Sequence, residues 1–168
     1  MSNSIIFYIM VLLPFFVQYS LYFSERKRRK TLRQLSKLRR RQLGLKELSL
    51  LMNNVLHYPI LYRGYSIALL LIVVFLGLTV GSDEGYPSSK TYTFAMFCLI
   101  SVVLYCFLQY ALLKKRKQFS ESSIFISFLE KNSDFPPITS ELYANRFKVI
   151  YVSLAIAILN LIIYILLG

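Results

Sequence analysis

Four long stretches of this chain contain no Asp, Glu, Lys or Arg, and they alternate with segments that hold all of the charged side chains. The uncharged stretches are Ser4 to Phe23, Tyr65 to Gly81, Tyr92 to Leu113 and Val149 to Leu167. A helix of about 20 apolar residues spans the ~30 Å hydrocarbon core of a bilayer. With 56% hydrophobic residues and a mean hydropathy of +0.53, the composition is too apolar for a soluble domain of 168 residues. The sequence therefore predicts a chain surrounded mostly by lipid.

The predicted fold is all-α: an integral membrane four-helix bundle that forms a single transmembrane domain, residues 1–168. The second span begins before its uncharged stretch, because Pro59 suits the first turn of a helix, where its missing N–H costs nothing. The predicted spans are 4–23, 59–81, 92–113 and 148–167, and the loops on the basic side are 24–58 and 114–147.

Positive charge sets the predicted orientation. Of the 20 Lys and Arg residues, twelve lie in Ser24 to Tyr65 and seven in Lys114 to Lys148, whereas the short connection Ser82 to Thr91 holds only Lys90. By the positive-inside rule both basic loops face the cytoplasm, so the N- and C-termini and the short connection face outside. We expect a multi-pass protein of a bacterial inner (cytoplasmic) membrane.

Twelve basic residues beside the spans are assigned to the membrane surface, where each would attract anionic headgroups by ~1 kcal/mol. They are Arg26, Lys27, Arg28, Arg29, Lys30, Arg39, Arg40, Arg41, Lys114, Lys115, Arg116 and Lys117. The net charge of +12 also invites a nucleic-acid interpretation. That interpretation is disfavoured, because the first basic run begins directly after a span, where such residues normally orient the helix.

The spans themselves offer little chemistry. Transporters and channels usually place ionisable groups at mid-membrane, and these spans have none. Gln18, Gln109 and Asn160 are interpreted as polar side chains that hydrogen-bond between packed helices. Soluble-enzyme motifs are missing and there is one histidine, so the sequence assigns no catalytic residue and predicts no metal site.

If the chain binds a small ligand, the cytoplasmic entry of the second span is the candidate site. Asn53, Asn54, His57, Tyr62 and Arg63 fall within about three helical turns there, beside a basic loop that would attract an anion. The simpler interpretation of His57, an imidazole hydrogen-bonded at the membrane interface, carries more weight than a ligand-binding role.

Three short motifs resemble the membrane-associated eicosanoid and glutathione metabolism (MAPEG) family. Leu13–Gln18 resembles the Tyr-Pro-x-x-x-Gln of the first span in bacterial members, and Asn54–Tyr62 is similar to the Asn-x-x-Glu-x-Pro-x-Leu-Phe that opens their second span. Asn145–Phe147 is similar to the end of the Asn-x-x-x-x-Arg-Phe entry to their fourth span. The resemblance implies a trimer of four-helix subunits, with glutathione or a lipid thioether bound between subunits near the cytoplasmic face.

The chain departs from the family pattern at positions that matter for catalysis. Leu50 stands where catalytic members have Arg, His57 stands where they have Glu, and the third span lacks the arginine that would polarise a thiol. Without bidentate arginine partners a glutathione carboxylate would bind weakly. Even within the family, thiol activation is therefore not expected.

The competing interpretation is a non-catalytic membrane protein, either an accessory subunit of a larger membrane complex or a small oligomeric effector or immunity-type protein. The apolar patch Ile124 to Leu129 would then dock a partner, or else form a short interfacial helix on lipid. The two interpretations differ in the expected partners: a homo-oligomer, trimeric if MAPEG-like, or a foreign subunit.

Overall fold

A computed structural model describes residues 2–26, 30, 34, 59–81, 89–131, 133 and 140–167. Among these residues there are helices and turns and no β-strand, so the predicted all-α class is confirmed for the described part of the chain. The helices are α1 (Ser2–Ser24), α4 (Pro59–Gly81), α5 (Ser89–Ser120), α6 (Ser123–Lys131) and α7 (Ser140–Leu167).

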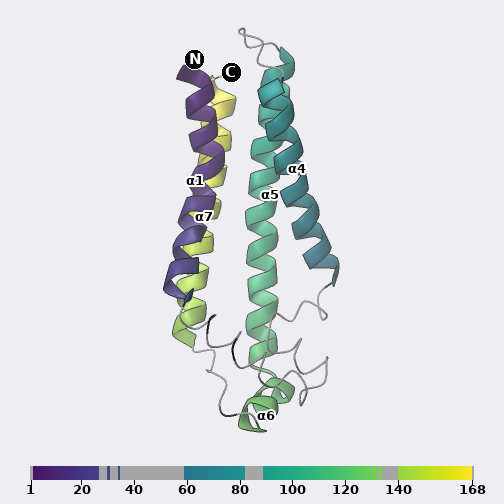
Figure 1. The fold of residues 1–168 in the computed structure, drawn as a ribbon, viewed down its shortest axis with the longest axis vertical. Helices are drawn as coiled ribbons and strands as arrows, with labels where there is room; N and C mark the ends of the chain where they lie inside the picture. The colour runs from purple at the N-terminus through teal and green to yellow at the C-terminus, as the bar shows by residue number, and fades with distance from the viewer. Residues whose placement is uncertain are drawn as a thin grey trace.

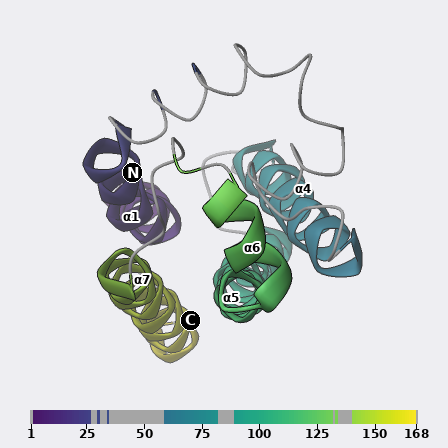
Figure 2. The ribbon, with the colours of Figure 1, turned by 90° about the horizontal axis from the view of Figure 1, so that it is seen from below.

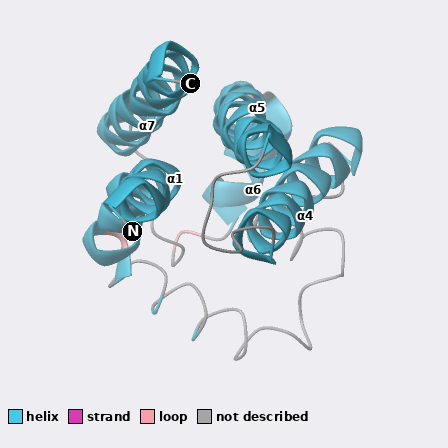
Figure 3. Cartoon of the chain, turned by 90° about the horizontal axis from the view of Figure 1, so that it is seen from above, coloured by secondary structure: helices cyan, strands magenta, loops and turns pink. Residues whose placement is uncertain are grey.

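The four long helices run side by side as two pairs (Figure 1). Helix α1 packs along α7, α4 packs along α5, and contacts between α5 and α7 join the two pairs. Seen from below, α4 lies on the far side of α5 from α7, and α1 lies beside α7 (Figure 2). The view from above gives the same order (Figure 3). Helix α5 is therefore the central element of the bundle.

Both termini lie at the end of the bundle where α4 ends and α5 begins (Figure 1). The opposite end holds the end of α1, the start of α4 and α7, and the short helix α6. We call this opposite end the basic end, because Lys114, Lys115 and Lys117 lie there. Which end faces the cytoplasm stays a prediction from the charge distribution.

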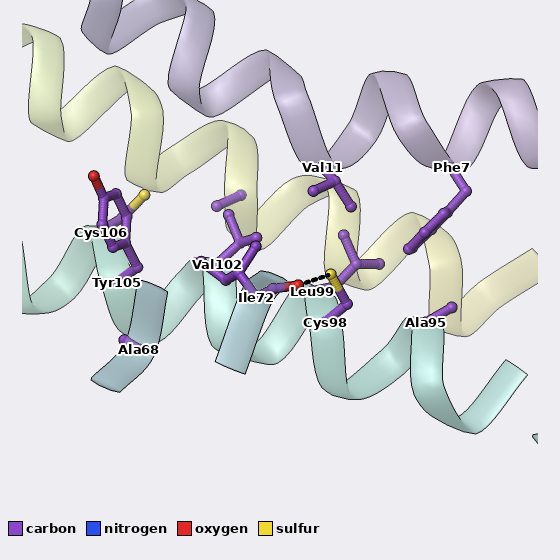
Figure 4. Packing of buried hydrophobic residues seen from close by; sticks show 11 residues of the cluster. Phe7, Val11, Ala68, Ile72, Ala95, Cys98, Leu99, Val102, Tyr105 and Cys106 are labelled. Atoms are coloured by element: carbon purple, nitrogen blue, oxygen red, sulfur yellow. Dashed lines mark hydrogen bonds between the residues drawn. The ribbon is translucent and has the colours of Figure 1, made fainter. Parts of the chain in front are cut away.

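The core is built around α5, because this helix has neighbours on several sides. Small side chains at some of its buried positions allow close approach. The Cys98 Sγ, for example, donates to the carbonyl oxygen of Ile72 in α4 at 3.8 Å (Figure 4). Cys98 and Cys106 are both buried free thiols. The buried cluster comprises Phe7, Val11, Ala68, Ile72, Ala95, Cys98, Leu99, Val102, Tyr105, Cys106 and Ala157.

Large apolar side chains also cover the outside of the bundle, including Phe16, Leu70, Val73 and Phe107. Three described helices are long and apolar enough to cross a bilayer: Ile60–Gly81, Lys90–Ser120 and Ser140–Leu166. An apolar exterior on helices of this length is stable in lipid and not in water. The predicted membrane character is confirmed for these three helices. The described apolar stretch of α1, Ile6–Leu21, is shorter, so a span in α1 stays a prediction.

The segment predicted as the loop 114–147 is largely helical. No Gly or Pro follows Leu113 until Pro136, so α5 continues past the uncharged stretch to Ser120. There the hydroxyl groups of Ser120 and Ser122 donate to the carbonyl oxygens of Lys117 and Phe119 at 2.7 and 2.6 Å, which satisfies two of the last carbonyls. Helix α7 begins at Ser140, before the predicted span 148–167, and is one 28-residue helix with Glu141 in its first turn, where an acid interacts favourably with the helix dipole.

Candidate functional site

The most deeply buried charge among the described residues belongs to an ion pair at the basic end of the bundle. Arg146 of α7 donates from Nε to Glu25 Oε1 at 2.6 Å and from Nη2 to Oε2 at 2.5 Å. The Glu25 side chain is 2% exposed and the Arg146 side chain 18%. A carboxylate can be buried this deeply only when a charged partner and hydrogen bonds replace its water. The pair is therefore a structural link between the ends of α1 and α7.

Local structure brings these two residues together. The N–H of Glu25 donates to the Leu21 carbonyl at 3.1 Å, so the helical bonding of α1 continues to Glu25, whose carboxylate meets α7. The Arg146 guanidinium lies 5.8 Å from the centre of the Tyr143 ring, a cation–π distance. The Tyr143 hydroxyl in turn donates to the Arg116 carbonyl at 3.2 Å, which connects α5 to the same cluster.

Arg116 adds a second guanidinium to this end of the bundle. Burial, and then the nearby Arg146 guanidinium, lower the pKa of Arg116 below its ordinary value. An arginine keeps its proton at neutral pH even so. Among the residues that the structure describes, no carboxylate forms an ion pair with Arg116. The inner face of the basic end therefore keeps a positive charge next to the neutralised Glu25–Arg146 pair.

A second polar cluster lies deeper, between α1, α4 and α5. The hydroxyl oxygens of Tyr65 and Tyr105 are 2.9 Å apart, and Gln109 Nε2 donates to the Tyr105 hydroxyl at 3.0 Å. Gln18 Nε2 of α1 donates to Cys106 Sγ at 3.6 Å. The Tyr105 ring also stacks on the Tyr65 ring, with centroids 4.8 Å apart. These bonds give the polar groups of the apolar interior partners inside the protein.

The structure places the three polar side chains that the sequence assigned to helix packing. Asn160 Nδ2 of α7 donates to the Met10 carbonyl of α1 at 2.8 Å, and Gln18 links α1 to α5 through Cys106. Gln109 bonds to Tyr105 of its own helix. Two of the three side chains therefore connect different helices, and the third organises a buried tyrosine.

Replacement of Asn160 by Leu should destabilise the bundle only slightly, by ~0.6 kcal/mol, because hydrogen bonds between membrane helices average about that much. The loss of helical circular dichroism during titration with sodium dodecyl sulfate measures it. Asn145→Leu, at an exposed position of the same helix, is the matched control. Equal stability of the two variants would show that the bond to Met10 contributes nothing.

Only part of the predicted ligand cluster lies among the described residues. Tyr62 is 40% exposed and stacks on Tyr65 at a centroid distance of 6.3 Å, and Arg63 is exposed beside it. Asn53, Asn54 and His57 lie outside the described residues. A convergence of the five residues therefore stays a prediction.

The basic surface residues are described in part. Arg26, Lys30, Lys114, Lys115 and Lys117 are exposed at the basic end, as a role at the membrane surface requires, and Arg116 is half-buried. The others lie outside the described residues, and they are Lys27, Arg28, Arg29, Arg39, Arg40 and Arg41.

An open groove of about 320 Å³ lies between α5 and α7 near the basic end. Tyr151 donates to the Tyr110 hydroxyl oxygen at 3.3 Å, and the Tyr110 ring meets the Phe147 ring edge-on at 5.8 Å. The complete lining is Tyr110, Lys114, Lys117, Gln118, Glu121, Phe147 and Tyr151. This groove was not predicted from the sequence, although the α5 residues that line it recur at helical spacing and so share one face. Their partners on α7 could not be identified from the sequence.

No protein-family model matches the chain, and no curated protein or solved structure is similar enough to count as a relative. Within the described ranges, no three His, Cys, Asp or Glu side chains come together in a way that could hold a metal ion. The resemblance to the MAPEG family therefore depends on the short motifs alone.

Proposed function

We propose that this chain is a non-catalytic accessory subunit of a membrane complex, with its basic end in the cytoplasm. The observation that carries the proposal is the pairing of Arg146 with Glu25. Arg146 belongs to the motif that resembles the family's entry to its fourth span, and its guanidinium fork is occupied by an internal carboxylate. An arginine paired in this way is not available for bidentate binding of a glutathione carboxylate.

The polar groups of the bundle interior support the same proposal. Asn160 bonds to a backbone carbonyl, and the Tyr105 hydroxyl bonds to both Tyr65 and Gln109. A reaction centre needs groups that are held ready for a substrate. Here the interior polar groups form hydrogen bonds with other groups of the protein, which suits a role in helix packing.

Helix α6 supplies a surface for a partner at the basic end. Phe125 is buried and meets Phe119 at a centroid distance of 5.7 Å, so α6 is anchored on the end of α5. Ile124 and Ile126, on either side of Phe125 in the chain, are exposed. An anchored helix with exposed apolar residues is suited to contact another protein through the patch Ile124 to Leu129.

Native mass spectrometry of the protein, purified in a mild detergent, tests the proposal. We expect a complex with a second, stoichiometric subunit. Ile124→Glu together with Ile126→Glu should remove that subunit, because two charges would be buried against it. Lys131→Glu, at an exposed position near the end of the same helix, is the control and should leave the complex intact.

Titration with glutathione distinguishes the accessory role from the MAPEG-like one. We expect no saturable binding up to millimolar concentration, because the Arg146 guanidinium is occupied. A homotrimer that binds glutathione, and loses that binding in Arg63→Ala or His57→Ala, would contradict the accessory role and support the family resemblance.

A further inference from the structure

We propose that the groove between α5 and α7 binds one anionic phospholipid, with the phosphate at Lys114 and Lys117 and an acyl chain against Tyr110 and Tyr151. The lining residues of the groove carry this inference. It depends on the membrane position of the helices and is independent of the accessory role. An experiment that contradicts the lipid site would therefore not contradict the accessory role, and the reverse also holds.

The position of the groove along α5 places it at the headgroup level. Lys114 is the first charged residue after the uncharged stretch that ends at Leu113. Tyr110 lies one turn before Lys114, on the apolar side, and Lys117 and Gln118 lie one turn after it. The lining of the groove therefore changes from aromatic to cationic side chains at the depth where the bilayer changes from hydrocarbon to phosphate headgroups.

The charged part of the groove suits a single phosphate group. Lys114 and Lys117 bring two ammonium groups to one side, and the Gln118 side chain can add an amide donor. Glu121 also lines the groove and lies 3.8 Å from Lys117, with both side chains well exposed. An exposed pair of this kind contributes little free energy, so Lys117 can turn to a phosphate at small cost. The lining keeps an excess of positive charge, which favours an anionic lipid over a zwitterionic one.

The aromatic part of the groove suits the apolar body of a lipid. Phe147, Tyr110 and Tyr151 line this part of the groove. The Tyr151 side chain is large and aromatic, yet 52% of it is exposed. Exposed residues continue along α7 beyond Tyr151, at Ala155 and then Ile158. These exposed residues lie along α7 toward the middle of the bilayer, which is the direction that an acyl chain takes from its headgroup.

Binding of phosphatidylglycerol to the purified full-length protein in neutral detergent, counted as lipid adducts by native mass spectrometry, tests the proposal. Lys114→Gln together with Lys117→Gln should weaken binding about 30-fold, because each lysine near a headgroup contributes ~1 kcal/mol. Lys131→Gln together with Lys148→Gln removes the same charge from exposed positions outside the lining, and should change the affinity less than about twofold. Gln and Lys have similar helix propensities, so all of these variants should fold.

Two further ligands separate a lipid site from a general electrostatic field. Phosphatidylcholine should bind at least tenfold more weakly than phosphatidylglycerol, and glycerol phosphate, which has no acyl chain, should not compete at equal concentration. The proposal is overturned by equal losses in the two double variants. It is also overturned if phosphatidylcholine binds as well as phosphatidylglycerol, or if glycerol phosphate competes fully.

Discussion

Glu25→Gln should destabilise the folded bundle by about 3–5 kcal/mol, the usual effect of removing one partner from a buried ion pair. The substitution keeps the shape of the side chain but removes its charge, so Arg146 would keep a mostly buried guanidinium without its counter-ion. The chain contains no tryptophan, so the loss of helical circular dichroism during titration with sodium dodecyl sulfate is a suitable measurement.

Two variants make the prediction specific. Glu121→Gln breaks the exposed pair with Lys117 and should cost less than about 1 kcal/mol, because water already solvates both groups. Combining Glu25→Gln with Arg146→Met should recover most of the stability, since no uncompensated charge remains buried. If Glu25→Gln behaved like Glu121→Gln, the pair would not be the link between α1 and α7 that its geometry indicates.

Leu99→Ala should have the second large effect, a loss of about 2–5 kcal/mol. Leu99 is 1% exposed at the centre of α5, where α1, α4 and α7 also contribute buried residues. Removing its three terminal carbon atoms leaves a cavity whose lining atoms lose their dispersion contacts. Between membrane helices this packing term matters especially, because lipid supplies no hydrophobic driving force for their association.

Leu104→Ala is the matched control, because it is the same substitution in the same helix at a position that is 44% exposed. Its side chain meets lipid in the folded state and also after the helices separate, so we expect a change below about 0.5 kcal/mol. Both variants are measured by the same detergent titration. Similar losses at the two positions would mean that α5 is not the central helix of the bundle.

The helices could be predicted from the sequence because their signals are local. Uncharged stretches of membrane length mark α4, α5 and α7, although α7 begins at Ser140 and not at the predicted residue 148. The end of α5 was harder to place. The positive charges at Lys114 to Lys117 mark where the chain leaves the membrane, but they do not interrupt a helix, so α5 continues to Ser120.

The candidate sites were less predictable, because their members are far apart in the chain. Glu25 is an isolated acid beside a basic run, and only the fold shows that it meets Arg146, 121 residues later. The α5–α7 groove has the same origin, because Tyr110 and Tyr151 are brought together by packing. For Asn160 the sequence predicts only that a buried amide in lipid needs a partner, and the fold shows that its Nδ2 donates to the Met10 carbonyl.

The alternation of charge-free and basic segments determined by itself that the chain forms membrane helices, because the cost of burying charge and bare backbone in lipid depends on each segment alone. The tertiary structure decided which helices pair, that α5 is central, and that Arg146 is neutralised by Glu25. It also decided that Lys114 and Lys117 border an aromatic groove. These features arise from contacts between segments distant in sequence, and the free energy of such contacts depends on side-chain packing that no single segment encodes.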